Sequence, residues 1–115
     1  MDEVYFSVVV PVYNSGKTLP LLNDELHEVM GELEEGFEII YVNDYSPDDS
    51  WEVLKAIKQQ FPDTVRAIKL ANNVGQWMAM IAGTSCCKGR AIITIDDDME
   101  YLTSDIHKLI KNYRN

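Results

Sequence analysis

The sequence alternates apolar, strand-like runs with amphipathic, helix-like segments four times, and this alternation is what most constrains its fold. The strand-like runs are 4–12, 37–43, 65–70 and 91–95. The first is rich in β-branched residues, and the apolar residues of the first and the last run do not alternate with polar ones. Such runs are typical of strands that are buried on both faces. Four βα units joined by right-handed crossovers predict an α/β fold with three layers, in which a parallel, Rossmann-like sheet of about four strands lies between helices.

The segments between the strands carry the marks of helices. Apolar residues at steps of three and four along Leu19–Leu33 form one stripe of an amphipathic helix. Ser46 is expected to cap a second helix, with Pro47 at its first position and acids in its first turn. Trp77 and Met80 have helical spacing in a third helix and are interpreted as core residues. A last helix is expected to carry Leu102, Ile106, Leu109, Ile110 and Tyr113.

The length and charge of the chain exclude several classes of protein. Its 115 residues suit a single domain, 1–115, that can bury a core without disulfide or metal staples. Ten basic residues stand against 19 acidic ones, and this net charge of −9 argues against a nucleic-acid partner. No apolar run approaches the roughly 18 residues of a membrane span, and we do not expect the acidic start to be a signal peptide. The adjacent Cys86 and Cys87 are expected to be reduced, buried, small hydrophobic residues of a cytoplasmic protein.

Polar residues follow each predicted strand, at positions 11–14, 43–46, 72–75 and 96–100. Parallel sheets bind ligands at the carboxyl ends of their strands, where the strand order reverses, so we expect the site at this edge. Asp44 is expected either to cap a turn or to accept a hydrogen bond from a base or ribose, and the sequence favours neither. Tyr13 is either an aromatic residue at the edge of the core or a face on which a base stacks.

The acidic run after the last strand is the strongest chemical signal. The carboxylates of Asp96, Asp97 and Asp98 repel one another unless a positive charge lies among them. Mg²⁺ or Mn²⁺ prefers oxygen ligands and often shares them with phosphates. Residues two apart on an extended chain point the same way, so Asp96 and Asp98 can converge. The run predicts a metal–nucleotide site, and the alternative is a solvated acidic loop that caps the last helix.

Two other phosphate-binding motifs are disfavoured. The run Gly16–Thr18 resembles the end of a P-loop, but the first glycine of that motif would fall at Pro11 and bulky residues occupy the loop. The chain also lacks the G-x-G-x-x-G pattern of dinucleotide-binding folds. His27 and His107 are interpreted as surface or packing residues and not as ligands.

Four short motifs occur in order, each after a predicted strand: Pro11-Val12-Tyr13-Asn14, the segment 43–50, Asn72-Asn73-Val74-Gly75 with the small residues of 79–83, and the segment 95–100. Together they resemble the nucleotide-binding half of the inverting family 2 glycosyltransferases with the GT-A fold. The likeness is greatest to the branch of dolichol-phosphate mannose synthases and bacterial polyprenyl-phosphate glycosyltransferases, and it runs from about Val4 to Tyr113. The resemblance implies the strand order third, second, first, fourth, in one domain truncated before the acceptor-binding half.

The resemblance also implies roles for the matched residues. Pro11 and Tyr13 would line the pocket of the nucleobase, and Asp44 would bond the base. Asp98 would bind the metal, and Asp96 would approach the ribose or the water shell of the metal. No catalytic base is implied, because the acceptor-binding half is absent. The full implied set is Pro11, Tyr13, Asn14, Asp44, Asn73, Gly75, Asp96 and Asp97 for the nucleotide, and Asp98, Asp96 and Glu100 for Mg²⁺ or Mn²⁺.

Several positions depart from the family pattern. Asn43 replaces the first of two acids, and Tyr45 stands where glycine is common. Asn72 replaces an arginine and Glu100 replaces a glutamine, and both changes make the site less favourable to a diphosphate. Leu102 and Thr103 replace two prolines.

The implied function is transfer of a sugar, with inversion, from a UDP- or GDP-sugar to a polyprenyl phosphate or a growing cell-surface glycan. The chain alone is expected to be inactive, and it is expected to reach the inner face of the membrane only through a C-terminal part beyond it. One alternative is a catalytically silent nucleotide-sugar-binding or assembly module. Another is a different Mg²⁺-dependent phosphate-handling domain, whose key acid would follow the first strand, where Tyr13 and Asn14 stand. The uncharged fourth strand, at an edge of the implied sheet, predicts a homodimer.

Overall fold

A computed structural model describes residues 3–95, 106, 108 and 110–112 of the chain. Strands and helices alternate through it in the order β1 (Val4–Val12), α1 (Leu19–Gly31), β2 (Gly36–Asn43), α2 (Ser50–Gln60), β3 (Val65–Lys69), α3 (Gln76–Thr84) and β4 (Ala91–Thr94). The predicted α/β alternation is confirmed. Among the described residues, no helix combines the length and the apolar character that crossing a membrane requires.

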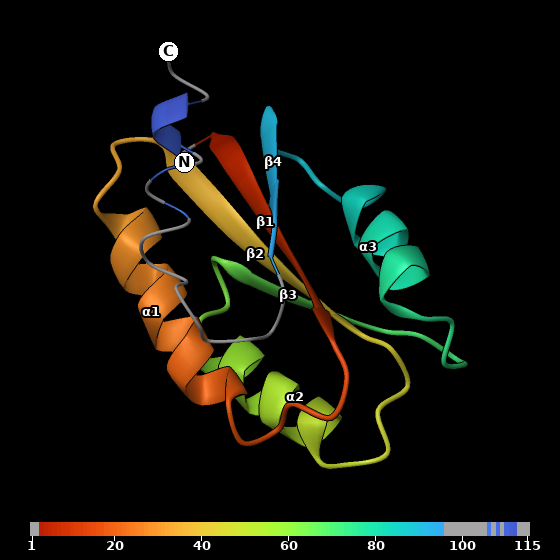
Figure 1. Ribbon diagram of the computed structural model, residues 1–115. Helices are drawn as coiled ribbons and strands as arrows, with labels where there is room; N and C mark the ends of the chain where they lie inside the picture. Colours follow the sequence, from red (N-terminus) through yellow and green to blue (C-terminus); the bar gives the residue numbers. More distant parts are fainter. Residues whose placement is uncertain (1–2, 96–105, 107, 109, 113–115) are drawn as a thin grey trace.

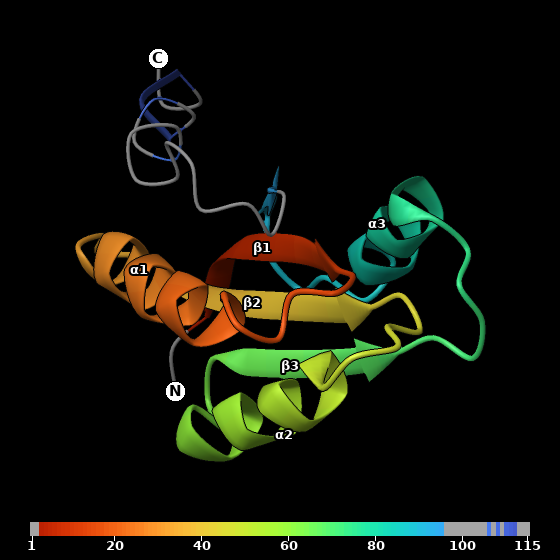
Figure 2. The ribbon, with the colours of Figure 1, turned by 60° about the horizontal axis from the view of Figure 1, so that its bottom comes forward.

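The four strands form one parallel sheet in the order β3-β2-β1-β4. The central strand β1 sets Val8 opposite Ile39 of β2 and Ile93 of β4. Helices α1 and α2 lie on one face of the sheet and α3 lies on the other (Figures 1 and 2). The expected three layers and strand order are confirmed, and the carboxyl ends of β1, β2 and β3 meet at one edge.

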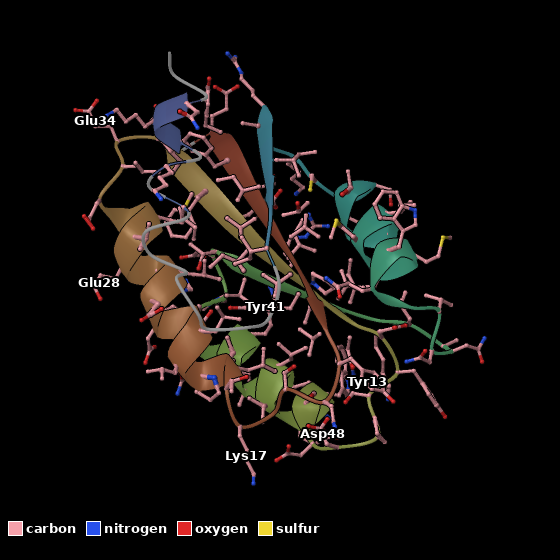
Figure 3. All side chains as sticks on the ribbon, viewed as in Figure 1. Tyr13, Lys17, Glu28, Glu34, Tyr41 and Asp48 are labelled. Atoms are coloured by element: carbon pink, nitrogen blue, oxygen red, sulfur yellow. The ribbon has the colours of Figure 1, made fainter. Side chains whose placement is uncertain are left out.

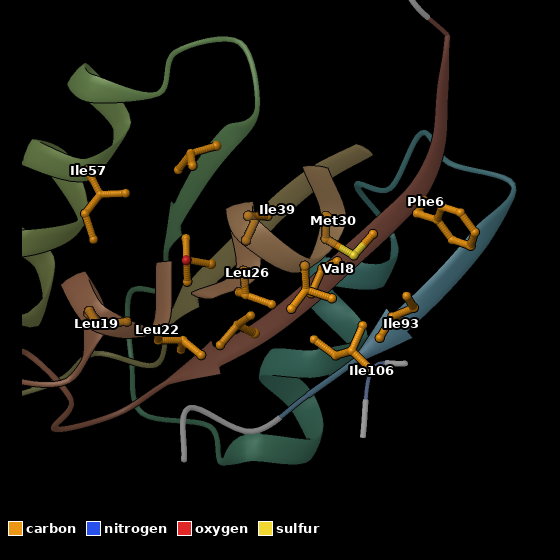
Figure 4. Packing of buried hydrophobic residues seen from close by; sticks show 14 of the residues in the cluster. Phe6, Val8, Leu19, Leu22, Leu26, Met30, Ile39, Ile57, Ile93 and Ile106 are labelled. Carbon is orange, nitrogen blue, oxygen red and sulfur yellow. The ribbon is translucent and has the colours of Figure 1, made fainter. Parts of the chain in front are cut away.

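The main core lies between the sheet and helices α1 and α2 (Figure 4). Val8 and Ile39 pack there with Leu22 and Leu26 of α1 and Leu54 of α2, and all five are fully buried. Ile106 and Ile110, which are helical and buried, belong to the same core, as expected of the last helix. The other positions expected in that helix, Leu102, Leu109 and Tyr113, lie outside the residues whose side chains are described, as does His107.

Helix α3 covers the second face of the sheet through its small residues. Ala79 is buried against Val9, Ile40 and Val42, and the helix approaches so closely that Gly83 has no room for a side chain. Met80 packs half-buried against this cluster, as expected. Trp77 does not, because two residues along a helix turn it about 200° away from Ala79. Its side chain is 73% exposed, so the interpretation of Trp77 as a core residue is wrong.

Three local expectations have different outcomes. Helix α2 begins at Ser50 with Asp49 as its capping residue, so the prediction that Ser46 caps it is wrong. The hydroxyl of Ser46 instead accepts a hydrogen bond from the backbone N–H of Asn14 and donates one to the carboxylate of Asp48. His27 is a packing residue as predicted, because its ring stacks on Phe61 and its nitrogens bond Thr64 and a backbone carbonyl. The two cysteines are free as predicted, but they are half-buried, and burial raises the pKa of Cys87.

We expect Gly83→Ala to destabilise the protein through the close packing of α3. An added Cβ would lie 2.6 Å from Cγ1 of Val9 and 2.8 Å from Cγ2 of Val42, which is far inside van der Waals contact. Overpacking of this kind costs about 1–3 kcal/mol of the free energy of unfolding, measurable by urea denaturation.

Gly31→Ala is the matched control, since Gly31 is also helical but a Cβ there meets no atom within 4 Å. It should stabilise the protein by up to about 1 kcal/mol because alanine favours the helix. A Gly83→Ala variant as stable as the native chain would contradict the packing described for α3.

Candidate functional site: a cavity at the carboxyl edge of the sheet

The loops that follow β1, β2 and β3 meet at the carboxyl edge of the sheet and enclose a cavity. It has a volume of about 400 Å³ and lies beside the N-terminal end of α3. Five of the residues assigned to the nucleotide from the sequence line it. Val12 and Gln76 also line it and were missed, although each lies within or directly after a motif that the sequence shows. The lining residues are Pro11, Val12, Tyr13, Asp44, Asn73, Gly75 and Gln76.

Asp44 joins the end of β2 to the start of α3. Its side-chain carboxylate accepts hydrogen bonds from the backbone N–H groups of Val74 (2.7 Å) and Gly75 (2.9 Å), and the residue is only 3% exposed. The side-chain amide of Asn73 donates to the backbone carbonyl of Asp44 at 3.1 Å. Of the two interpretations left open by the sequence, the structure therefore supports the cap of a turn. Each carboxylate oxygen can accept a second hydrogen bond, so a contact to a base stays a hypothesis.

The turn before α3 depends on the glycine at position 75. Gly75 has φ of +92°, a conformation that residues with a side chain rarely adopt. This conformation lets two successive N–H groups point at the carboxylate of Asp44. The N-terminal end of α3 consequently borders the cavity, and its partial positive charge is matched by a buried acid.

Tyr13 and Asn14 occupy the loop after β1 in different ways. Tyr13 lies beyond the end of β1 at the rim of the cavity (Figure 3), with its side chain 49% exposed. Asn14 has φ of +60° and donates its backbone N–H to the hydroxyl of Ser46 at 2.7 Å. Asn14 does not line the cavity, so its contact with a nucleotide stays a prediction.

Asp48 ties the loop after β1 to the loop after β2. One carboxylate oxygen accepts hydrogen bonds from the backbone N–H (3.0 Å) and hydroxyl (2.6 Å) of Ser50 and from the hydroxyl of Ser46. The other oxygen accepts the backbone N–H of Gly16 at 3.1 Å. In the sequence, the alternation of Ser46, Asp48 and Ser50 is the available sign of this contact between loops, but serine before proline and acids also suits the start of a helix.

These hydrogen bonds govern the ionisation of Asp48. Partial burial raises the pKa of its carboxyl, but the bonds from Ser46, Ser50 and Gly16 more than offset burial and hold the pKa far below the usual value for an aspartate. In the folded protein the carboxylate therefore stays ionised to a lower pH than that of an ordinary aspartate.

Two departures from the family pattern lie in the loop after β2. Tyr45 has φ of +52°, so the turn keeps a left-handed conformation that glycine would adopt more easily. The side chain of Asn43 is buried, and its carbonyl oxygen accepts the backbone N–H of Ser46 at 3.1 Å. Its amide nitrogen has no hydrogen-bond partner among the described residues, and an unpaired buried donor costs stability.

The acidic residues predicted to hold a metal, Asp96, Asp98 and Glu100, lie outside the described residues, as does Asp97. Immediately before them, the backbone N–H of Ile95 donates to the carbonyl of Val9 at 3.1 Å. Ile95 therefore lies beside β1, at the carboxyl end of β4. Within the described part of the chain, no group of three or more His, Cys, Asp or Glu residues could hold a metal ion.

Comparison with known proteins assigns the chain to a family. The family described as Glycosyl transferase family 2 matches residues 7–115, and the chain belongs to it. The undecaprenyl-phosphate 4-deoxy-4-formamido-L-arabinose transferase of Pseudomonas syringae pv. syringae (strain B728a) is 35% identical over 93% of the chain. The enzyme of that name from Yersinia pestis (strain Pestoides F) is 38% identical over 90% of the chain. The chain spans about a third (32%) of the length of each.

Solved structures share the fold at low sequence identity. TarS residues 1–349 from S. aureus aligns with 96% of the chain at a TM-score of 0.65 and 22% identity, and the match covers 33% of that protein. The mannosyltransferase PcManGT from Pyrobaculum calidifontis, solved with GDP-Man and Mn²⁺, aligns with 84% at a TM-score of 0.67 and 20% identity, covering 28% of its chain. These structures confirm the expected fold class.

We expect Asp48→Asn to destabilise the protein in a pH-dependent way. The folded state lowers the pKa of Asp48, so its contribution is fully present above about pH 4, the ordinary range for an aspartate, and is lost as the pH falls through the lower folded pKa. Above that range the variant should lose about 1 kcal/mol of the free energy of unfolding, a value kept small because the side chain is exposed.

Urea denaturation between neutral and acidic pH measures the difference between variant and native chain, which should narrow as the solution becomes acidic. Asp63→Asn removes the same charge from an exposed turn and serves as the control. A stability difference for Asp48→Asn that does not change with pH would contradict the role of the ionised carboxylate.

Proposed function

We propose that the cavity binds the nucleotide of a UDP- or GDP-sugar and that the chain is the donor-binding part of a glycosyltransferase. The observation that carries this proposal is the convergence of Pro11, Tyr13, Asp44, Asn73 and Gly75. They come from three loops far apart in sequence, yet they line one cavity at the ligand-binding edge of a parallel sheet. Related folds were solved with UDP-GlcNAc and with GDP-Man, which supports a sugar nucleotide as the ligand.

The lining residues suit a nucleotide in distinct ways. The half-exposed ring of Tyr13 offers a face on which a base can stack. The remaining lone pairs on the carboxylate of Asp44 can accept hydrogen bonds from the base, while its bonds to the turn before α3 keep it in place. Binding at such rigid groups would orient the donor sugar for attack.

A divalent cation fits the residues that follow β4. Asp96, Asp98 and Glu100 supply carboxylate oxygens, the ligands that Mg²⁺ and Mn²⁺ prefer, and the chain runs toward them along the strand whose end lines the cavity. When bound, the cation would neutralise the negative charge on the leaving nucleoside diphosphate. Neutralisation by a cation matters more in this chain, because Asn72 stands where the family has a positively charged arginine.

The acceptor that we propose is a polyprenyl phosphate. Two relatives are named for undecaprenyl phosphate, and each is more than 30% identical to this chain. The phosphate oxygen of such an acceptor is already ionised near neutral pH, so an in-line attack with inversion needs little help from a general base. The acceptor-binding residues would belong to a part beyond these 115 residues, and the complete enzyme would build cell-surface glycans at the cytoplasmic face of the membrane.

We expect Mg²⁺ or Mn²⁺ to raise the affinity of the chain for a nucleoside diphosphate. Isothermal titration calorimetry with UDP and with GDP, with and without the metal, measures this gain. Asp98→Ala should abolish the gain because a ligand of the cation is lost. Tyr13→Ala should weaken binding about tenfold at any metal concentration, as expected for the loss of base stacking.

Asp63→Ala is the matched control for the loss of a carboxylate, since Asp63 lies in a turn away from this cavity, and binding should be unchanged. Nucleotide affinity that does not depend on the metal, or a full metal effect in Asp98→Ala, would refute the assigned metal site.

We also propose that two copies pair through the edge of the sheet. Within the described residues β4 pairs with β1 alone, and its other side presents unpaired backbone groups without charge or proline. Thr94→Lys places a charge on this edge at an exposed position and should shift a micromolar dimer to monomer in sedimentation equilibrium. Gln59→Lys makes the same charge change on α2 and should leave the dimer intact. A native chain that sediments as a monomer would refute the proposal.

A further inference from the structure

Helix α3 exposes an apolar stripe on the side that faces away from the sheet. The positions i, i+3, i+4 and i+7 from residue 74 are all large and apolar, the spacing of one face of a helix. Ile92 of β4 is exposed on the same face of the sheet, since it lies beside Ser7 and not among the residues of the main core. The exposed side chains are Val74 (47%), Trp77 (73%), Met78 (50%), Ile81 (47%) and Ile92 (44%).

The charge of this region differs from that of the rest of the chain. Acidic residues number 19 of 115, yet none occurs between residues 64 and 95, and residues 70–87 carry no charge at all. Glu28 and Glu34 project on the opposite side, from the α1 side and away from α3 (Figure 3). Among the described residues, a stretch from 64 to 95 without acids is unexpected in a protein of net charge −9.

Basic side chains border the stripe at the C-terminal end of α3. Arg66 donates to the backbone carbonyl of Cys86 (2.7 Å) and to the carboxylate of Glu38 (3.2 Å), and Lys88 and Arg90 follow with exposed side chains. Burial raises the pKa of Glu38, but hydrogen bonds from Ser7, the backbone of residue 88 and Arg66 lower the pKa by more than burial raises it. This buried acid therefore stays ionised and holds Arg66 in place.

Three acids, Glu3, Glu38 and Asp63, line one hollow with Lys88 and Arg90, and they offset the basic charge only in part. Among the described residues, Asp63 is exposed and forms no ion pair with either basic residue. The carboxylate of Glu38 is buried and already paired with Arg66. Glu3 is exposed and lies 4.0 Å from Arg90, at the limit of an ion pair. Lys88 therefore stands beside the apolar stripe as an exposed cation, and Arg90 is at most weakly paired in water.

We propose that this α3 face, defined by Val74, Trp77, Met78, Ile81 and Ile92 with Lys88 and Arg90, docks on the surface of an anionic lipid bilayer. Apolar side chains on one side of a helix enter the boundary between headgroups and acyl chains, and basic residues beside them pair with anionic lipids. The inference deepens the proposed function and rests on it in one respect: a polyprenyl phosphate acceptor lies in a membrane. Since Gly75 and Gln76 border the cavity, docking would hold the donor site close to that acceptor.

The charges favour a bilayer over a second copy of the chain. A two-fold contact of this face with itself would bring the basic borders of both copies into one interface. Insertion of α3 into a bilayer surface removes no charge from water, because residues 70–87 have none. Glu28 of α1 would face away from the anionic lipids in that orientation (Figure 3).

Co-sedimentation with vesicles of phosphatidylcholine, with and without phosphatidylglycerol, tests the proposal on the chain itself. Binding should require phosphatidylglycerol and should weaken as the salt concentration rises. Trp77→Ala should weaken binding about tenfold, the loss expected for one large apolar side chain. Lys88→Gln and Arg90→Gln should each weaken it about fivefold. Neither change touches the backbone bonds of these residues or the ion pair of Arg66.

Two matched controls lie on the opposite face of the molecule. Leu21→Ala removes an exposed apolar side chain (60%) from α1, and Lys55→Gln removes an exposed cation from α2, and neither should alter vesicle binding. Brominated lipid should quench the fluorescence of Trp77 in the bound protein, with Trp77→Phe giving the background from Trp51.

Absence of binding to phosphatidylglycerol vesicles, or equal losses in the control variants, would overturn the proposal. Self-association without lipid that Trp77→Ala abolishes would also overturn it, because a second copy would then cover the face. Calorimetry with a nucleotide separates this inference from the proposed function. Trp77→Ala should keep the metal-dependent affinity of the native chain for the nucleotide. A native chain that binds vesicles but has no metal-dependent affinity for the nucleotide would refute the proposed function alone.

Discussion

The two hydrogen bonds from the turn before α3 to the carboxylate of Asp44 connect the parts on which the candidate site depends. They join the end of β2 to the start of α3 and use the positive φ of Gly75. An unpaired carboxylate this deeply buried would be costly, so the turn and the acid require each other. Because Asn73 and Gly75 line the cavity together with Asp44, the shape of the site follows from this contact.

The two faces of the sheet are covered in different ways, and the difference has functional consequences. Large residues of α1 and α2 bury one face, whereas α3 reaches the other through Ala79 and Gly83. A helix that packs with its small residues must turn its large ones outward, and Trp77 is accordingly exposed. The same close approach that seats the N-terminal end of α3 beside the cavity therefore creates the apolar surface that we assign to lipid.

Most of the fold could be predicted from the sequence, because apolar runs that do not alternate with polar residues, as at the centre of β1, imply burial on both faces, and the motifs after the strands indicated the family. The candidate site was predicted in part: Pro11, Tyr13, Asp44, Asn73 and Gly75 line one cavity, while Val12 and Gln76 were missed. Two interpretations were wrong for physical reasons. Helical spacing does not say which side of α3 faces the sheet, and Ser46 can cap a helix or bond a loop with the same hydroxyl.

By itself, the sequence determined the order of strands and helices, the family, and a segment from 64 to 95 without acidic residues. These properties depend on local patterns of polarity and size, which can be recognised without knowing which segments contact one another. Only the tertiary structure decided that Asp44 caps the turn before α3, that Asp48 ties two loops together and that Trp77 faces outward. Each of these depends on which groups from distant segments compete for the same donors, acceptors and space, and that competition is resolved only when the sheet brings the segments together.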